Sequence, residues 1–176
     1  EPANASSVHA FGRRARSRLE SARATVARAV GAAAEGVIFV SGGTEANNLA
    51  LLGMAGPVLV SAVEHPSVLE AVPDAPRVPV DDAGRLDLAA LERLLHQHRP
   101  GLVSLMLANN ETGVVQPVAE AARLAHAAGS LVHVDAAQAL GRIPVVRDEL
   151  VAVLLTLAGH KLGGPPGVGV LVLRPG

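Results

Sequence analysis

The chain has no cysteine, and this absence excludes several kinds of chemistry. Without a thiol, its 176 residues can form no disulfide, no cysteine-ligated zinc site and no thiol nucleophile. The absence is compatible with a reducing cytoplasm, and we expect a cytoplasmic protein. Long apolar runs are also missing, since none reaches the roughly 18 residues that a membrane-spanning helix needs. We therefore expect no membrane partner.

The chain also lacks a large charge of either sign, because its formal net charge is −1. The basic footprint of a nucleic-acid-binding protein is missing, so we expect no nucleic-acid partner. Arginines do cluster early, at positions 13, 14, 16, 18 and 23, but Glu20 dilutes them, which favours a solvated helix face. The seven histidines include one close pair, His96 and His98, whose flanks are typical of a solvated helix end. We therefore expect no metal site.

The composition is typical of a globular domain with its own core, since 49% of the residues are hydrophobic and 18% are charged. The sequence begins with Glu-Pro-Ala-Asn, without an initiator methionine, and ends at Pro-Gly shortly after an apolar run. We therefore expect one domain, residues 1–176, that is incomplete at both ends.

Short apolar runs alternate with helical patterns along the chain. The runs predict buried strands at residues 37–40, 58–61, 102–107, 131–135, 153–157 and 168–173. Helices are predicted at residues 8–30, 45–55, 88–95 and 117–128. Asp87 stands where an N-cap would, Pro117 at a first-turn position, and Gly129 where a helix could end. This alternation predicts an α/β layer structure around a mostly parallel sheet.

Polar clusters stand at the ends of five predicted strands. They comprise residues 41–44, 64–65, 109–113, 135–138 and 159–161, and the fourth cluster includes the last residue of its strand. In sheets of this class, ligands bind beyond the carboxyl ends of the strands. We therefore expect the chemistry of the protein to lie at this edge of the sheet.

The first cluster, Ser41-Gly42-Gly43-Thr44, joins a predicted strand to a predicted helix. Such a turn presents free backbone N–H groups at the positive end of a helix dipole, where a phosphate fits. Thr44 could add a hydroxyl. A Gly-Gly pair before a helix is also typical of a plain turn, so this motif alone leaves both interpretations open.

Two further clusters also allow two interpretations each. His65, which precedes Pro66, is either a solvent-exposed histidine at a helix start or an imidazole that lies over a cofactor ring. The segment Asn109-Asn110-Glu111-Thr112-Gly113 is either a plain loop or a pair of amides that hydrogen bond a ligand.

Asp135 ends a predicted buried strand, where a carboxylate needs a partner. A protonated pyridine nitrogen would serve, and the ion pair would keep the ring a good electron sink. Gln138 could reach the same ligand if the chain turns into a helix there. Alternatively, Asp135 is a helix N-cap, a role that aspartate often fills.

Lys161 lies in Ala-Gly-His-Lys (158–161) and is the only lysine in a chain with fourteen arginines. Where arginine fills the surface positions, a retained lysine suggests chemistry that a guanidinium cannot perform. Formation of a Schiff base is one such reaction, because it needs a primary amine with an accessible neutral form.

Together, five motifs resemble the cysteine desulfurase family, a branch of the class V aminotransferases that uses pyridoxal 5'-phosphate (PLP). They are Ser-Gly-Gly-Thr-Glu-Ala-Asn-Asn (41–48), Glu-His-Pro-Ser-Val (64–68), Asn-Asn-Glu-Thr-Gly-Val (109–114), His-Val-Asp-Ala-Ala-Gln (133–138) and Gly-His-Lys (159–161). The resemblance runs from Asn4 to Gly169. It implies the three-layer α/β/α large domain of PLP-dependent transferase fold type I, with the small C-terminal domain absent from this chain.

The resemblance implies two catalytic residues and three that bind the cofactor ring. Lys161 would be the Schiff-base lysine and would shuttle a proton, and His65 would stack on the ring and assist proton transfers. Asp135 would pair with the pyridine nitrogen. Gln138 would bond the phenolic oxygen, and Asn110 would lie near that oxygen and the substrate.

For the phosphate of PLP, the resemblance implies three binding residues: Gly43, Thr44 and His160. Ala158 stands where the family has a phosphate-binding serine. A lost hydrogen bond to a charged phosphate predicts weaker PLP binding, by roughly 1.5–3 kcal/mol.

In the family, L-cysteine is converted to L-alanine, and the sulfur leaves as a persulfide on a mobile cysteine, for iron–sulfur cluster or thio-cofactor assembly. The resemblance also implies a homodimer and a sulfur-acceptor scaffold protein as partners. The mobile cysteine, and the arginine that grips the substrate carboxylate, normally lie after the lysine and are not in these 176 residues. Three functions stay open: a cysteine desulfurase-like enzyme, another class V PLP enzyme such as selenocysteine lyase, and a non-catalytic copy.

Overall fold

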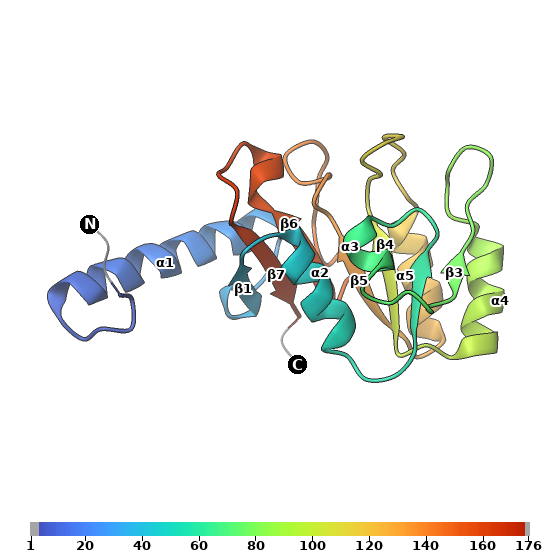
Figure 1. Cartoon of the computed structure of the whole chain (residues 1–176), viewed down its shortest axis with the longest axis horizontal. Coiled ribbons are helices and arrows are strands. Elements are labelled where there is room, and N and C mark those ends of the chain that lie inside the picture. Colours follow the sequence, from blue (N-terminus) through green and yellow to red (C-terminus); the bar gives the residue numbers. More distant parts are fainter. Residues whose placement is uncertain (1–3, 175–176) are drawn as a thin grey trace.

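A seven-stranded sheet forms the centre of the computed structural model, which describes residues 4–174 (Figure 1). The strands are β1 (Val37–Val40), β2 (Val58–Ser61), β3 (Arg77–Val78), β4 (Leu102–Met106), β5 (Leu131–Asp135), β6 (Leu154–Ala158) and β7 (Gly169–Leu173), in the spatial order β1-β7-β6-β5-β4-β2-β3. Strands β6, β5, β4, β2 and β3 run parallel, whereas β7 pairs antiparallel with both β6 and β1. The carboxyl ends of all strands except β7 therefore lie at one edge.

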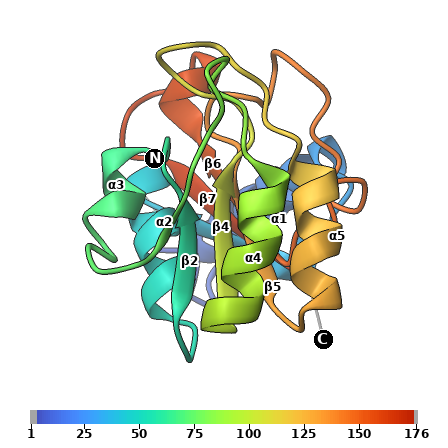
Figure 2. The same cartoon turned by 90° about the vertical axis from the view of Figure 1, so that its right-hand side faces the viewer.

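Helices cover both faces of the sheet, as Figure 2 shows. They are α1 (Ala10–Ala29), α2 (Gly43–Leu52), α3 (Pro66–Leu69), α4 (Leu88–His98) and α5 (Val118–Ala127), with 3-10 turns at Ala34–Gly36 and Gly159–Leu162. Helices α4 and α5 and the end of α1 share one apolar core with the sheet, and α2 and α3 share the other. The chain is thus a three-layer α/β/α structure.

The side chains of β5 show how the strands divide between the two layers. Val132 and Val134 belong to the core beneath α4 and α5. His133 and Asp135 alternate with them, and the Asp135 carboxylate meets α2 on the opposite face. Leu131 lies on this face too, but the other two residues, His133 and Asp135, are polar although they are buried, which sets this face apart as unusual.

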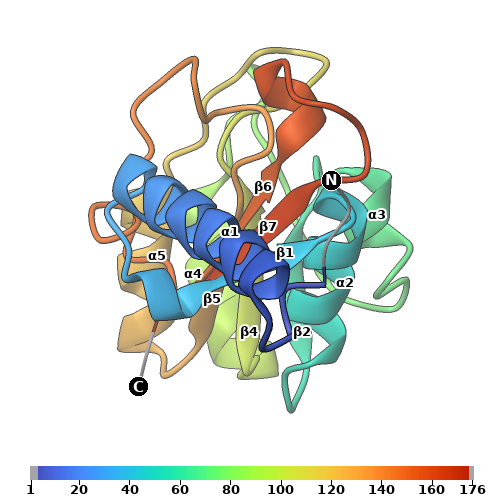
Figure 3. The same cartoon turned by 90° about the vertical axis from the view of Figure 1, so that its left-hand side faces the viewer.

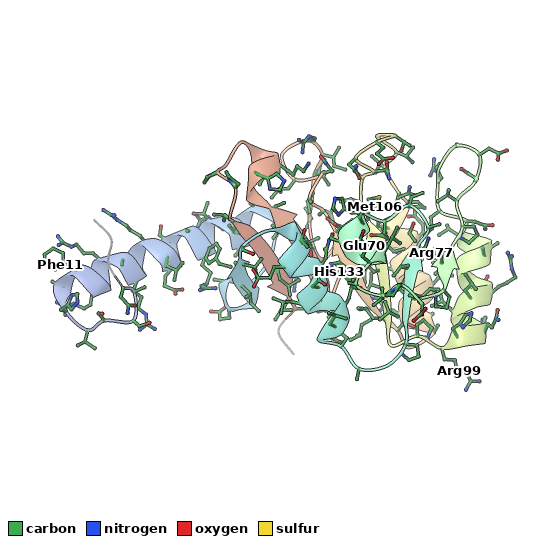
Figure 4. The ribbon with its side chains drawn as sticks, viewed as in Figure 1. Phe11, Glu70, Arg77, Arg99, Met106 and His133 are labelled. Carbon is green, nitrogen blue, oxygen red and sulfur yellow. The ribbon has the colours of Figure 1, made fainter. Side chains whose placement is uncertain are left out.

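Helix α1 packs on the body only through its last turns, where Ala27 and the following Val30 are buried. Its first turns extend away from the sheet (Figures 1 and 3), and Phe11 lies at the far end of this projection (Figure 4). Val8 and Phe11 are 87% and 51% exposed. Within residues 4–174, no helix combines the length and the apolarity that a membrane crossing requires.

The predicted α/β fold with a mostly parallel sheet is confirmed, and six strands lie within one residue of the predicted ranges. Besides the two 3-10 turns, one strand and one helix were not predicted. Strand β3 has only two residues, and Arg77 is exposed, so it forms no apolar run. Helix α3 is a single turn. Three helix starts differ from prediction: α1 begins at Ala10 and not at residue 8, α2 begins at Gly43 and not at residue 45, and α5 begins at Val118 because Pro117 is its N-cap.

Two helix-end predictions are confirmed by the backbone. Asp87 is the N-cap of α4, where its Oδ1 accepts a hydrogen bond from the Ala90 N–H at 2.9 Å. Gly129 follows the C-cap of α5 with a φ of 83°, in the left-handed region that glycine adopts readily. The expected domain of residues 1–176 stays a proposal, and its residues 1–3 and 175–176 lie outside the described part.

Candidate active site

A cavity of about 260 Å³ opens at the carboxyl edge of the sheet, on the face that carries α2 and α3. Its lining comes from the ends of β1, β2, β4, β5 and β6, the five strand ends that carry the polar clusters. All eight residues that the sequence singles out line it: Gly43, Thr44, His65, Asn110, Asp135, Gln138, His160 and Lys161. The fold therefore brings together groups that are more than a hundred residues apart in the chain.

The turn after β1 forms one end of the cavity, where α2 begins at Gly43. Its N-cap, Gly42, offers no side-chain hydrogen bond, so the free N–H groups of the first turn have no side-chain cap. Ser41 is held instead by Glu45, whose Oε2 accepts from the Ser41 N–H and hydroxyl, both at 2.6 Å. These bonds lower the pKa of Glu45. The bonds between Ser41 and Glu45 thus stabilise the turn, and the backbone N–H groups at the start of α2 stay without a side-chain acceptor.

Gly169, at the start of β7, packs closely against the backbone of this turn at Gly42. A Cβ at Gly169 would lie 2.4 Å from the carbonyl carbon of Gly42, so no larger residue fits without moving the turn. The sequence gives no signal for this contact, because the two glycines are far apart along the chain and come together only where β7 pairs with β1.

His65 is the N-cap of α3, and its side chain is exposed to the cavity. Its Nδ1 accepts a hydrogen bond from the Ser67 N–H at 3.1 Å and contacts the Ser67 hydroxyl at 2.8 Å. His65 thus starts a helix and also lines the cavity, and its position over a cofactor ring stays a prediction.

Glu64, the residue before His65, is buried and reaches across to β4, where its Oε1 accepts from the Met106 N–H at 2.5 Å. Its Oε2 has no partner among the described residues. Burial raises the pKa of Glu64 well above its usual range, and the nearby charge of Asp135 adds to the effect. Glu64 therefore favours its neutral form and fastens the end of β2 to β4.

Asp135 lies at the floor of the cavity and is 6% exposed. Its Oδ1 accepts from the Ala137 N–H at 2.9 Å, and its Oδ2 accepts from Asn47 Nδ2 at 2.8 Å. Both donors are neutral. Within residues 4–174 the ion pairs are Arg23 with Glu20 and Arg147 with Asp148, so no basic side chain neutralises Asp135 there.

A line of buried polar side chains crosses the sheet below Asp135. His133 Nδ1 contacts Ser104 Oγ on β4, and its Nε2 contacts Thr156 Oγ1 on β6, each at 2.9 Å. Burial lowers the pKa of His133 to about 4, although the charge of Asp135 opposes the change. His133 is therefore neutral at physiological pH and lies inside the body of the molecule (Figure 4), so it does not compensate the Asp135 carboxylate.

Lys161 and His160 lie on the exposed 3-10 turn that follows β6. Arg142 ties this turn to the loop after β5, because its guanidinium donates to the carbonyl oxygens of Gln138 at 3.2 Å and Lys161 at 3.1 Å. The bonds hold the backbone of two cavity-lining residues at a fixed separation. Arg142 has no role in the expectations from sequence.

The loop after β4 is held by Asn109, which lies outside the cavity lining, whereas Asn110 lines it. Asn109 Oδ1 accepts from the N–H groups of Glu111 and Thr112, and its Nδ2 donates to the Val63 carbonyl at 3.1 Å. The two adjacent amides thus differ: Asn109 shapes the loop, and Asn110 is exposed at the cavity. The loop interpretation therefore applies to Asn109, and ligand binding by Asn110 stays a prediction.

Two polar lining residues have no role in the expectations from sequence: Asn47 and Ser67. Asn47 lies one helical turn after Gly43, so the spacing of four residues could have placed it on the same face of α2. No comparable signal exists for Ser67, which enters the site only because α3 lies beside α2.

Comparison with known proteins gives one family match and many close relatives. Aminotransferase class-V, as a family, matches residues 1–176. The cysteine desulfurase IscS of Dictyoglomus turgidum is 40% identical over 187 residues, which cover 98% of this chain and 47% of the relative. A cysteine desulfurase of Rhodobacter capsulatus is 44% identical over 188 residues, with coverages of 98% and 48%. The chain therefore spans about half the length of the curated relatives it matches.

Solved structures agree with the sequence relatives. A NifS-like protein from Rickettsia africae superposes with a TM-score of 0.92 at 36% identity, over 98% of this chain and 51% of that one. DndA from Streptomyces lividans gives a TM-score of 0.85 at 39% identity, over 97% and 51%. The expected resemblance is confirmed. Since the family match covers every residue and the fold agrees, the chain belongs to the class-V aminotransferase family.

Proposed function

We propose that this chain is the PLP-binding large domain of a cysteine desulfurase-like enzyme. One observation carries the proposal: a lysine, a buried aspartate, a histidine and a glycine-rich helix start, each from a different strand end, line a single cavity. Members of the family depend on PLP. The relatives from Dictyoglomus turgidum and Rhodobacter capsulatus support the reaction class, because both are named cysteine desulfurases.

The residues of the cavity fit PLP on chemical grounds. Asp135 is a buried carboxylate whose hydrogen-bond donors are neutral, so its charge is free to pair with a protonated ring nitrogen. The uncapped first turn of α2 offers N–H groups to a phosphate, beside the hydroxyl of Thr44. Lys161 offers a primary amine. A cavity with one anion, one amine and one anion-binding turn matches the three functional groups of PLP.

When bound, PLP supplies an electron sink for the charge that develops at the substrate Cα. Asp135 would hold the proton of the ring nitrogen, and Lys161 Nζ would hold the cofactor and then move a proton at the substrate Cα. His65 would cover the ring and transfer a second proton. Gln138 and Asn110 would orient the ring and the substrate by hydrogen bonds from their amides.

Gly43, Thr44 and His160 would hold the phosphate. Thr44 and His160 are both exposed, so a phosphate could approach them from solvent without displacing other side chains. Because Ala158 contributes only a methyl group to the same lining, we propose that the phosphate is held by fewer hydrogen bonds than in the family.

The proposed reaction converts L-cysteine and an acceptor thiol into L-alanine and a persulfide. The Cβ–S bond breaks, an S–S bond forms on the acceptor, and the hydrogen lost by the thiol is retained in alanine, so no external oxidant or reductant is needed. The acceptor thiol lies outside these 176 residues, which contain no cysteine. We further propose a cytoplasmic homodimer that delivers sulfur to a scaffold protein for iron–sulfur cluster or thio-cofactor assembly.

The activity test uses the protein that carries this chain, supplied with PLP, L-cysteine and a thiol acceptor. Alanine that forms with the native chain and is lost in Lys161→Arg supports the proposal. Lys161→Arg keeps the positive charge and removes the reactive amine, so it is a matched control. Elemental selenium or selenide formed faster from L-selenocysteine would assign a selenocysteine lyase instead. PLP binding without alanine or selenide would indicate a different class V reaction.

A further inference from the structure

A chain of hydrogen bonds connects Asp135 to His65 through two residues that have no assigned role. Asn47 Nδ2 lies 2.8 Å from Asp135 Oδ2 and 2.9 Å from Ser67 Oγ. Ser67 Oγ lies 2.8 Å from His65 Nδ1. The hydrogen bonds lead from β5 through α2 to α3, and the two end residues, Asp135 and His65, are both proposed to contact the cofactor ring.

The chemistry of the partners fixes the direction of each hydrogen bond. The amide of Asn47 must turn its nitrogen toward Asp135, because the reverse orientation would place an amide oxygen against a carboxylate oxygen. Both amide hydrogens are then used, one by Asp135 and one by Ser67. Ser67 Oγ accepts from Asn47, so its own hydrogen is free to go to His65 Nδ1.

The backbone of α3 sets the tautomer of His65 independently. The Ser67 N–H donates to His65 Nδ1 at 3.1 Å, and a backbone N–H cannot accept. Nδ1 must therefore be the unprotonated nitrogen of the neutral ring, and Nε2 carries the hydrogen. Two donors from one residue converge on the same nitrogen, which leaves Nε2 as the only ring nitrogen available to a ligand.

The burial of Asn47 shows how strongly this arrangement is imposed. Asn47 is 1% exposed, and its Oδ1 has no partner among residues 4–174. A buried amide oxygen without a donor lowers the stability of the fold. This loss accompanies an orientation of Asn47 in which both amide hydrogens are bonded, one to Asp135 and one to Ser67. If position 47 served only for packing, an apolar side chain would be more stable there than an amide with an unpaired oxygen.

We propose that Asn47 and Ser67 are positioning residues that couple the two proposed contacts of the cofactor ring, Asp135 at the ring nitrogen and His65 over the ring. Asn47 holds the Asp135 carboxylate in place for a cationic ring nitrogen, and Ser67 holds His65 as the Nε2–H tautomer, so that His65 presents a proton donor to the ligand. The role of Asn47 toward the ring nitrogen rests on the proposed function. The role of Ser67 in setting the His65 tautomer does not, because it concerns the protein without PLP.

The test is a nuclear magnetic resonance measurement on the full chain with 15N-labelled histidine and no PLP. At about pH 8.5, well above the ordinary pKa of imidazole, long-range 1H–15N correlations distinguish the two tautomers. We expect the His65 signals, assigned with His65→Gln, to show an unprotonated Nδ1 and a protonated Nε2. A protonated Nδ1 would overturn the proposal.

The coupling is tested by a cycle of variants in the same measurement. Asp135→Asn weakens the acceptor for Asn47, so we expect it to shift the His65 ring nitrogen signals. Ser67→Ala removes the hydroxyl that joins Asn47 to His65, so in that background Asp135→Asn should hardly shift the His65 signals. In a Ser67→Thr background, which keeps a hydroxyl, Asp135→Asn should shift them again. An equal shift in the Ser67→Ala background would refute the coupling. Since PLP is absent throughout, failure here is distinguishable from failure to bind the cofactor.

Discussion

Replacing Ala158 with serine should strengthen the binding of PLP. Ala158 ends β6 beside the turn at Gly43, and it lines the cavity while only 3% exposed. Its methyl group lies 3.5 Å from the position that a Cβ on Gly43 would occupy. A serine hydroxyl at this position would therefore lie next to the first turn of α2, where we propose that the phosphate binds.

The expected gain follows from the chemistry of the added bond. A hydrogen bond to a charged group contributes about 1.5–3 kcal/mol, which corresponds to roughly ten- to a hundredfold in the dissociation constant of PLP. The assay is a fluorescence or absorbance titration of the apo chain with PLP. Ala137→Ser, which adds a hydroxyl at another lining position, is the matched control. Equal affinities for native and Ala158→Ser chains, or an equal gain in the control, would show that a hydroxyl at position 158 does not bind the phosphate.

Three other predictions concern the stability of the fold and are checked by urea unfolding. Arg147 is buried with Nε and Nη1 unpaired among the described residues, and its one ion-pair partner, Asp148, is largely exposed. Arg147→Met should therefore raise the free energy of unfolding by about 1–4 kcal/mol, whereas Arg147→Lys should not. Because its pKa is raised by burial, Glu64 stabilises the fold fully below its unfolded pKa of 4.5, and this contribution is lost as the pH rises through the folded value. Glu64→Gln should thus gain stability over the native chain as the pH is raised from 5 to about 8; a constant difference would contradict this. Burial lowers the pKa of His133 from 6.5 to about 4, so its contribution is present above pH 6.5 and is lost as the pH falls toward 4. The native chain should lose about 3 kcal/mol more than His133→Gln over that range, and parallel profiles would exclude the effect.

The strands and the edge that carries the site could be predicted from sequence because buried parallel strands are continuous apolar runs. The runs at β2 and β5 match the structure residue for residue, and each ends at a polar cluster. The antiparallel direction of β7 was not predicted. An apolar run carries no direction, although the short connection between β6 and β7 leaves no room for the crossover that a parallel pair needs.

The parts of the site that could not be predicted are contacts between elements. Asn47 meets Asp135 across 88 positions of sequence, and nothing in either local pattern encodes that meeting. The same holds for Gly169, which supports the turn at Gly42 only because β7 lies beside β1. Local patterns specify which residues end each strand, whereas the neighbours of those residues follow from the order of strands in the sheet.

Lys161 is proposed to be the amine that holds PLP in this cavity. The most direct measurement adds PLP to the purified chain, reduces the mixture with borohydride and maps the modified peptide by mass spectrometry. We expect a yellow protein before reduction and a single pyridoxyl adduct on Lys161, absent from Lys161→Arg. A colourless protein, or an adduct only on the chain's amino terminus, would contradict it.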